Sequence, residues 1–168
     1  NKPFAIFATA PSMDGFASAH SPLTDRNFKR NYDAAPPSVI LGDTAVLAAA
    51  PTELKAAGFG DIMAKFIALA DWQISSLLTD EGYCPSIAAL TRSVAEEVAA
   101  CAADVPRRDE ASAGAIMNAL VLTGAAMTLA GTPRPASGAE HDLSHFWEIK
   151  ALESGQIPEF HGKTVAVA

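Results

Sequence analysis

A helical pattern of apolar residues fills most of this chain after residue 43 and constrains its fold more than any other feature. Between residues 60 and 78 the spacing is close to 3.6 residues, with apolar side chains at Ile62, Phe66, Leu69, Ile74 and Leu77. Further helices are expected over 44–50, 52–57, 85–103, 110–130 and 141–152, separated by Pro51, Gly58, Pro106 and the Gly- and Pro-containing segment 131–135. Abundant alanine and only 7% aromatic residues favour packed helices over sheets. The sequence therefore predicts a mainly α fold.

The first 43 residues have a different character. The short apolar run 4–8 predicts a buried strand that delivers the loop 9–12, and such loops are where α/β sheets bind ligands. Residues 38–43 predict a second short strand, and the polar residues between the two strands give no clear element. We therefore expect a small α/β unit over 1–43 and a helical domain over 44–168, with the boundary near 43–50.

Composition excludes several functional classes. Apolar residues make up 49% and charged residues 18%, as in globular chains. The net charge is −7 and no basic run exceeds Arg107-Arg108, so neither a nucleic-acid surface nor an anionic-membrane surface is expected. No apolar run reaches about 18 residues, which predicts no membrane span. Cys84 and Cys101 have neither zinc-knuckle nor redox spacing, which favours a cytoplasmic protein with buried free thiols.

Three of the four histidines fall within the last 28 residues. His141 and His145 are four residues apart, so on a helix both imidazoles lie on one face. Either both chelate one metal, or one binds metal while the other faces a substrate. The alternative is a solvated helix start with incidental histidines. His161 follows a loop, where a lone histidine is most often a surface residue.

Two aspartates are further candidates, each with an ordinary structural explanation. Asp61 follows Gly58-Phe59-Gly60 and opens the predicted helix, a position where an acid commonly caps the helix. The glycine pair also permits close approach of the backbone to a ligand. Asp14 lies among small and hydroxyl residues suited to cofactor contact, but Asp-Gly equally marks a plain turn. The residues alone thus leave a metal site as one open interpretation.

Four motifs occur in order along the chain. They read Thr-Ala-Pro-Ser-x-Asp-Gly at 9–15, Ala-Ala-Gly-Phe-Gly-Asp-Ile-x-Ala-Lys at 56–65, Ser-Gly-x-Glu-His-x-x-Ser-His-x-Trp-Glu at 137–148 and His-Gly-Lys-x-Val at 161–165. Together they resemble the glycerol-1-phosphate dehydrogenases, which have the iron-containing alcohol dehydrogenase and dehydroquinate synthase-like fold. The resemblance implies that 44–168 is the multihelical C-terminal domain of that fold and that 1–43 is a remnant of its nucleotide-binding domain.

The resemblance also implies roles for individual residues. The metal ligands would be Asp61, His141 and His161, with a fourth position open to substrate or water. The substrate would contact Asp14, Asp61 and His145, of which Asp61 and His145 would be catalytic. The nicotinamide cofactor, NAD or NADP, would be lined by Thr9, Ala10, Pro11, Ser12 and Ser18. One divalent metal is implied, with zinc favoured and nickel or iron as alternatives, because Asp and His ligands tolerate several metals.

The implied reaction is reversible reduction of dihydroxyacetone phosphate to sn-glycerol 1-phosphate by NADH or NADPH, a step of phospholipid biosynthesis. The metal would polarise the ketone oxygen, and His145 would orient or protonate it. The expected partner is a small phosphorylated substrate, and a homo-oligomer stays an open alternative. Two other functions remain: a related glycerol or polyol dehydrogenase, and a non-catalytic helical module that binds metal or a partner. A dehydroquinate synthase-like lyase is disfavoured, since that branch has Glu where Asp61 stands.

We predict that these 168 residues alone bind NADH or NADPH negligibly. The family's N-terminal nucleotide-binding half, with its Gly-rich diphosphate loop, and its last helices are expected to lie outside this sequence. Each lost charge-assisted hydrogen bond is worth roughly 1.5–3 kcal/mol, so binding should weaken by orders of magnitude. Calorimetric titration with NADH and with NADPH measures this directly. Micromolar affinity for either cofactor would contradict the expectation.

Overall fold

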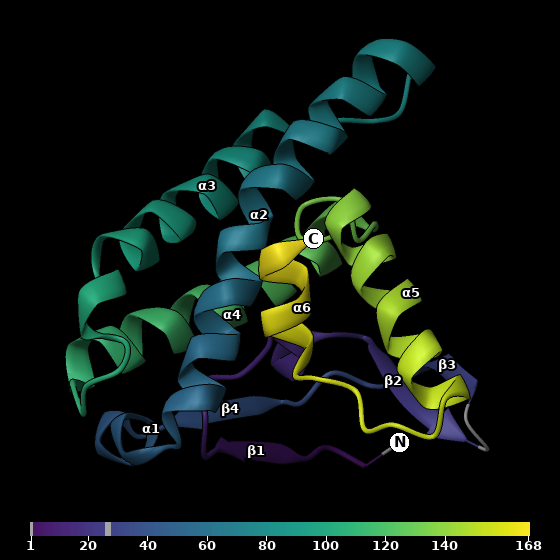
Figure 1. Ribbon diagram of the computed structural model, residues 1–168. Coiled ribbons are helices and arrows are strands. Elements are labelled where there is room, and N and C mark those ends of the chain that lie inside the picture. Colours follow the sequence, from purple (N-terminus) through teal and green to yellow (C-terminus); the bar gives the residue numbers. More distant parts are fainter. Residues whose placement is uncertain (1, 26–27) are drawn as a thin grey trace.

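A computed structural model of the protein describes residues 2–25 and 28–168 (Figure 1). The strands of this part of the chain are β1 (Ala5–Ala8), β2 (His20–Asp25), β3 (Phe28–Asp33) and β4 (Val39–Gly42). The α-helices are α1 (Thr44–Ala49), α2 (Thr52–Thr79), α3 (Pro85–Ala100), α4 (Glu110–Ala130), α5 (Ala139–Glu153) and α6 (His161–Val167). Short 3-10 helices lie at η1 (Asp14–Ala17) and η2 (Ala102–Asp104). The mainly α prediction is confirmed.

Helix α2 is the centre of the helical part. It packs against α3, α4, α5 and α6, as Figure 1 shows. The largest core cluster lies between α2, α3 and α4 and is built from the apolar side chains Ile62, Val94, Ala95, Val98, Val105, Ile116, Ala119 and Leu120. The backbone of α4 lies close to η1, since a Cβ on Gly124 would lie 2.8 Å from the carbonyl oxygen of Asp14.

Helix α2 is continuous where the sequence predicted two segments. Gly58 was expected to end a first segment and Asp61 to open a second, but both lie in the interior of α2. This prediction was wrong because Gly58 and Gly60 do not end a helix. Each of them allows the backbone of another segment to approach α2. A Cβ on Gly58 would lie 1.9 Å from the carbonyl oxygen of Pro11, far inside van der Waals contact. The loop after β1 is therefore pressed directly onto α2.

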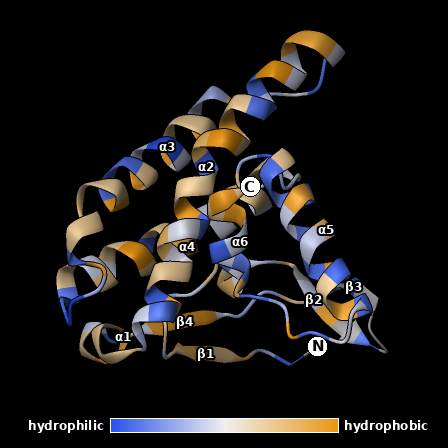
Figure 2. Cartoon of the chain, viewed as in Figure 1, coloured by the Kyte–Doolittle hydropathy of each residue, from blue (hydrophilic) through white to orange (hydrophobic). Residues whose placement is uncertain are grey.

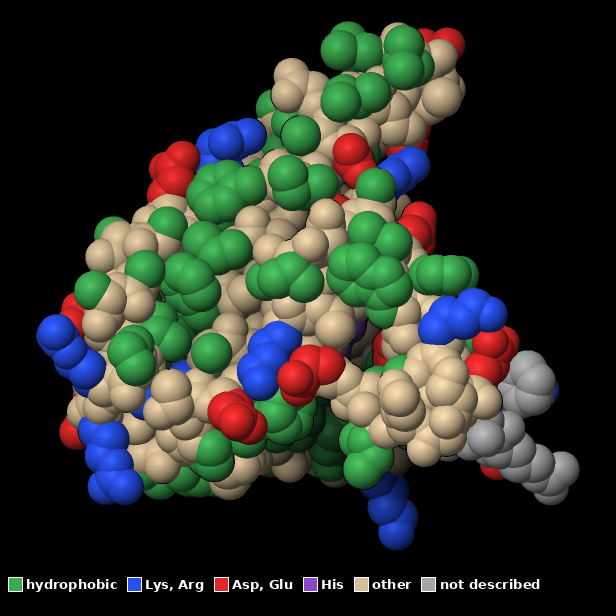
Figure 3. Space-filling view, viewed as in Figure 1, with side chains coloured by type: hydrophobic (Ala, Val, Ile, Leu, Met, Phe, Trp, Pro, Cys, Tyr) green, Lys and Arg blue, Asp and Glu red, His purple; other side chains and the backbone are tan. Residues whose placement is uncertain are grey.

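At the C-terminal end of α2, some side chains of the apolar pattern are exposed to solvent. Ile74 and Leu77 belong to the apolar pattern of the helix, yet they are 54% and 78% exposed. The last turns of α2 project beyond the helices that cover its first half, and apolar side chains gather over this end in Figure 3. The periodic pattern predicted the helix but not the length over which neighbours cover it.

The expected strands over 4–8 and 38–43 form as β1 and β4. They pair in parallel from Ala5 opposite Val39 to Ala8 opposite Gly42, and Figure 2 shows their apolar character. The prediction that residues 4–8 form a buried strand was wrong, because Ala8 is buried but Phe7 is 55% exposed. A core cluster formed with α1 and α4 covers the β1–β4 pair. It consists of Ala8, Leu47, Ala48, Ala113 and Met117.

A second pair of strands was not predicted. Strands β2 and β3 form an antiparallel hairpin in which Ser21 pairs with Tyr32 and Leu23 with Arg30. Polar residues dominate both strands, so the alternation of apolar and polar residues that marks a half-buried strand is weak.

Helix α4 requires a correction to the sequence analysis. By length and composition it could cross a membrane, although no apolar run of that length was expected. It is the one such helix among residues 2–25 and 28–168, and 44% of its most apolar window is buried inside the fold. Its packing against α1, α3 and η1 is that of a core helix.

Helix α6, which the sequence analysis did not predict, lies directly against α2. A Cβ on Gly162 would meet the carbonyl oxygen of Ala57 at 1.8 Å, and one on Gly60 would meet that of Gly162 at 2.4 Å. The two backbones thus approach at a distance that only glycine allows. Gly60 precedes Asp61 and Gly162 follows His161, so this contact sets the separation of the two candidate ligands.

We predict that Gly162→Ala destabilises the protein. The added methyl collides with backbone rather than with a movable side chain, so the cost should be at least the roughly 1–3 kcal/mol of ordinary overpacking. Urea unfolding measures this loss. Gly82→Ala is the matched control, because a Cβ there meets nothing within 4 Å. Equal stability of the two variants would contradict the role assigned to the contact.

Candidate metal and substrate site

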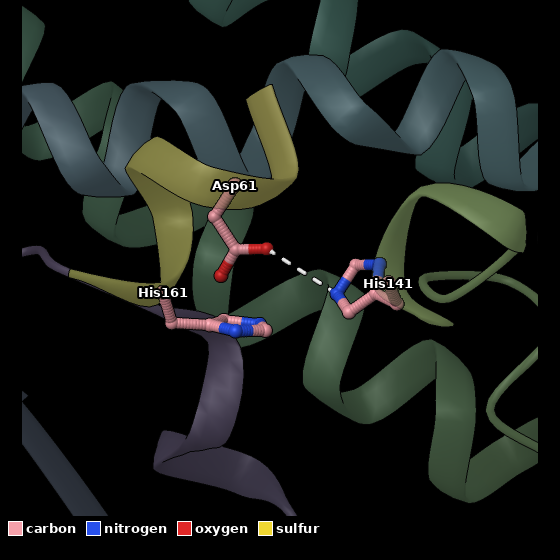
Figure 4. A group of neighbouring side chains, drawn as sticks. All are labelled: Asp61, His141 and His161. Atoms are coloured by element: carbon pink, nitrogen blue, oxygen red, sulfur yellow. Dashed lines mark ion pairs between the residues drawn. The ribbon is translucent and has the colours of Figure 1, made fainter. Parts of the chain in front are cut away.

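Three helices bring the predicted metal ligands together. Asp61 lies in the interior of α2, His141 in the first turn of α5 and His161 at the start of α6. One ligand atom from each lies within 4.8 Å of the others, and Figure 4 shows the three side chains pointing toward one another. Asp61 and His141 are buried, whereas His161 is half-buried. In tetrahedral sites with ligand bonds of about 2.0–2.2 Å, such atoms need only small shifts to share one ion.

A neighbouring acid orients His141. Its Nδ1 lies 2.6 Å from Oε1 of Glu140, while its Nε2 faces Oδ1 of Asp61 at 3.9 Å. Burial by itself would raise the pKa of Glu140, but hydrogen bonds from His141 and from the Gly138 backbone outweigh it and lower the pKa. A carboxylate on one imidazole nitrogen is the usual way to direct the other nitrogen at a metal.

The buried ammonium group of Lys65 pairs with the carboxylates of both aspartates. The Lys65 Nζ lies 2.6 Å from Oδ1 of Asp61 and 2.8 Å from Oδ2 of Asp14, and the backbone N–H of Asp14 donates to Oδ2 of Asp61 at 3.0 Å. Burial would raise the pKa of Asp61, but Lys65 and the two nearby histidines hold it below its ordinary value. Burial would likewise lower the pKa of Lys65, and the two carboxylates raise it instead.

The charge of this buried group suits a divalent cation. The carboxylates of Asp14, Asp61 and Glu140 and the ammonium of Lys65 leave a net charge of −2 when the histidines are neutral. Asp61 is fully buried, so that charge is poorly screened by water. Carboxylate oxygen and imidazole nitrogen are ligands accepted by zinc and by several first-row metals. The residues present therefore fit one divalent metal.

His145 faces the same cluster. Its ring centroid lies 6.1 Å from that of His141 and 5.5 Å from that of His161, in a stacked arrangement with the latter. The contact with His141 follows from the four-residue spacing, which places both residues on one face of α5, whereas the contact with His161 depends on the packing of α6 against α5. Asp14, the other residue assigned to the substrate, reaches the cluster through Lys65 and Asp61.

The predicted cofactor residues divide into two groups. Thr9 to Ser12 form the loop after β1, in which Pro11 is buried against α2 and Thr9 is exposed. Ser18 instead lines a cavity of about 530 Å³ between the β2–β3 hairpin and the end of α4. The other residues of its wall are Ala19, Asp33, Met127, Thr128, Gly131, Thr132 and Pro133. None of these is a candidate metal ligand, so this cavity lies apart from the cluster.

The sequence analysis gave no role to two residues of the site. Lys65 stands four residues after Asp61, the acid-to-base spacing that pairs side chains on a helix, and this signal could have identified it. Glu140 directly precedes His141 and carries no comparable signal, because neighbours in a helix point in different directions. The contact between Oε1 of Glu140 and Nδ1 of His141 depends on the side-chain rotamers in the first turn of α5.

Comparison with known proteins agrees with the arrangement of motifs. The family described as iron-containing alcohol dehydrogenase matches residues 1–51. Glycerol-1-phosphate dehydrogenase [NAD(P)+] from Halalkalibacterium halodurans is 39% identical over 174 residues and covers 99% of this chain. The enzyme of the same name from Geobacillus stearothermophilus is 40% identical over 166 residues, again over 99% of this chain. The resemblance stated from the sequence is thus confirmed.

Solved structures give the same fold. A probable glycerol dehydrogenase from Sinorhizobium meliloti aligns with 98% of this chain at a TM-score of 0.76 and 20% identity, and the alignment covers 47% of that protein. The predicted dehydroquinate synthase-like multihelical fold is therefore confirmed. This chain covers 42% and 41% of the two sequence relatives, about two fifths of their length.

We predict that Lys65→Met destabilises the metal-free protein by about 3–5 kcal/mol, because two buried carboxylates lose their cation. Added Zn²⁺ should recover part of this loss, since a dication takes over the neutralisation. Urea unfolding with and without Zn²⁺ checks both effects. Lys150→Met is the control, because its pair with Glu153 is exposed and should be worth about 1 kcal/mol at most. Similar losses in the two variants would contradict the interpretation.

Proposed function

We propose that this chain, which resembles the glycerol-1-phosphate dehydrogenases, provides the metal and the substrate contacts of an NAD(P)-dependent glycerol-1-phosphate dehydrogenase. The observation that carries the proposal is the convergence of Asp61, His141 and His161 from three separate helices onto one buried, negatively charged point. Lys65 pairs with Asp61 and Glu140 with His141, but neither pair requires His161 to face the same point, whereas a shared metal does.

The assignment of ligands follows from burial and orientation. Asp61, His141 and His161 would hold one divalent metal, zinc in the first instance and nickel or iron as alternatives. When bound, the metal supplies a Lewis acid that polarises a substrate oxygen. Glu140 keeps the His141 ring turned toward the site, and Lys65 keeps the Asp61 carboxylate ionised in its buried setting.

The substrate would lie on the side of the cluster where His145 faces His141 and His161. His145 is half-buried, so its ring is within reach of a bound molecule and can hold or deliver a proton at the substrate hydroxyl. Asp14, held by Lys65 and joined to Asp61 through its backbone N–H, would fix a substrate hydroxyl nearby. Asp61 would thus serve both the metal and the substrate.

The reaction would interconvert dihydroxyacetone phosphate and sn-glycerol 1-phosphate with NAD or NADP as the hydride carrier, in the cytoplasm. The names of the sequence relatives support the phosphorylated substrate and both cofactors. The second candidate is a dehydrogenase of a free polyol, which the name of the structural neighbour from Sinorhizobium meliloti favours. Comparing turnover of glycerol 1-phosphate with that of glycerol distinguishes the two.

We also propose a division of labour along the chain. Residues 1–43, which contain the strands, would contribute one wall of the cofactor cleft through Thr9, Ala10, Pro11, Ser12 and Ser18. Residues 44–168, which contain the α-helices, would carry the metal. The loop 9–12 supports this division because it lies on α2 close to Asp61, where a nicotinamide would have to meet the substrate.

We predict that His145→Ala keeps stoichiometric metal and loses turnover, whereas His141→Ala loses metal. The experiment uses the full polypeptide that contains these residues, with bound metal measured by elemental analysis and oxidation of glycerol 1-phosphate followed through NADH and NADPH. General acid–base catalysis is worth about 10²–10⁴-fold, so the His145→Ala rate should fall by that order. Asp142→Ala, at an exposed position of α5, is the control. Metal loss in His145→Ala equal to that in His141→Ala would refute this division of roles.

A further inference from the structure

A second group of metal-binding side chains lies beside the first. His145, Glu148 and His161 each offer a ligand atom within 4.8 Å of the others, and all three residues are half-buried. His145 and Glu148 are three residues apart on α5, on the face that already carries His141. His161 belongs to both groups, so the inner and outer groups share one imidazole.

The outer group lies beside a hollow in the surface. Glu148 is part of the wall of a cavity of about 290 Å³ formed by α5, the segment 156–159 and α6, with Trp147, Ala151 and Thr164 among its other residues. The inner group contrasts with this, because Asp61 is fully buried and His141 is 5% exposed. A hydrated ion can therefore approach Glu148 more readily than it can approach Asp61.

The chemistry of the outer group suits the same ions. Two histidines and one glutamate are a ligand set that zinc takes in proteins. In the inner group, Oδ1 of Asp61 lies 2.6 Å from the Lys65 ammonium. An ion that enters the inner group must shed its water and compete with that ammonium. An ion at the outer group can exchange water for ligands one at a time.

We propose that His145, Glu148 and His161 form an outer metal position that captures the divalent ion and passes it to Asp61 and His141 while His161 remains bound. This inference rests on the inner metal site of the proposed function. The shared imidazole makes the two positions alternatives for one ion, because a neutral imidazole offers one lone pair for a metal. The outer position therefore affects the rate of metal binding more than the equilibrium dissociation constant.

Glu148→Gln tests the capture step. Stopped-flow mixing of the metal-free protein with Co²⁺, followed through the visible absorption of the bound ion, should show loading slowed by about tenfold or more. The equilibrium Kd for Co²⁺ should change by less than about threefold, well under the 1.4 kcal/mol that corresponds to tenfold. Glu153→Gln, an exposed glutamate on the same helix, should load at the original rate. Unchanged loading in Glu148→Gln, or a Kd weakened as much as the rate, would overturn the proposal.

A second experiment isolates the outer position. The doubly substituted Asp61→Asn, His141→Ala protein should still bind one Co²⁺ weakly, and adding Glu148→Gln should abolish that binding. Absence of residual binding in the double variant, with far-UV circular dichroism unchanged, would overturn the outer position. Retention of the original tight binding in the double variant would instead show that the inner site of the proposed function is wrong. The two failures are therefore distinguishable.

Discussion

The close contact between the backbones of α2 and α6 is the constraint on which the rest of the site depends. Gly60 and Gly162 let the two helices approach until the carbonyl oxygens of Gly162 and Ala57 fill the space of absent side chains. Asp61 and His161 are the chain neighbours of these glycines, so their separation is set by backbone rather than by flexible side chains. A metal centre needs ligands placed to within fractions of an ångström, and rigid elements supply this better than loops.

A second close backbone contact brings the loop after β1 to the part of α2 that carries Asp61. Gly58 admits the carbonyl oxygen of Pro11, and the backbone N–H of Asp14 then donates to Asp61. Residues from the strand-containing part of the chain thus meet the helical part at one carboxylate. The buried Lys65 makes this arrangement electrostatically tolerable, because two carboxylates without it would repel each other in a poorly hydrated setting.

Several features were readable from local pattern alone. The helices over 85–103 and 110–130 follow from apolar spacing and from their bounding prolines, and they appear as α3 and α4 with small shifts at their ends. Two of the failures share one cause. Gly58 and Asp61 looked like the end and the start of two helices, and residues 161–167 were not recognised as a helix, because each is determined by contacts with distant segments. Strands β2 and β3 were missed for a different reason, since their polar residues give only a weak alternation.

The sequence by itself determined the mainly helical class and the identity of the candidate ligands, because helical periodicity and motif order are properties of neighbouring residues. The tertiary structure decided that Asp61, His141 and His161 share one point, since this depends on how α2, α5 and α6 cross. It also decided the roles of Lys65 and Glu140. Lys65 is buried between Asp61 of its own helix and Asp14, which lies 51 residues earlier in the chain. Residue spacing along one helix cannot predict a contact with a charged side chain from another element.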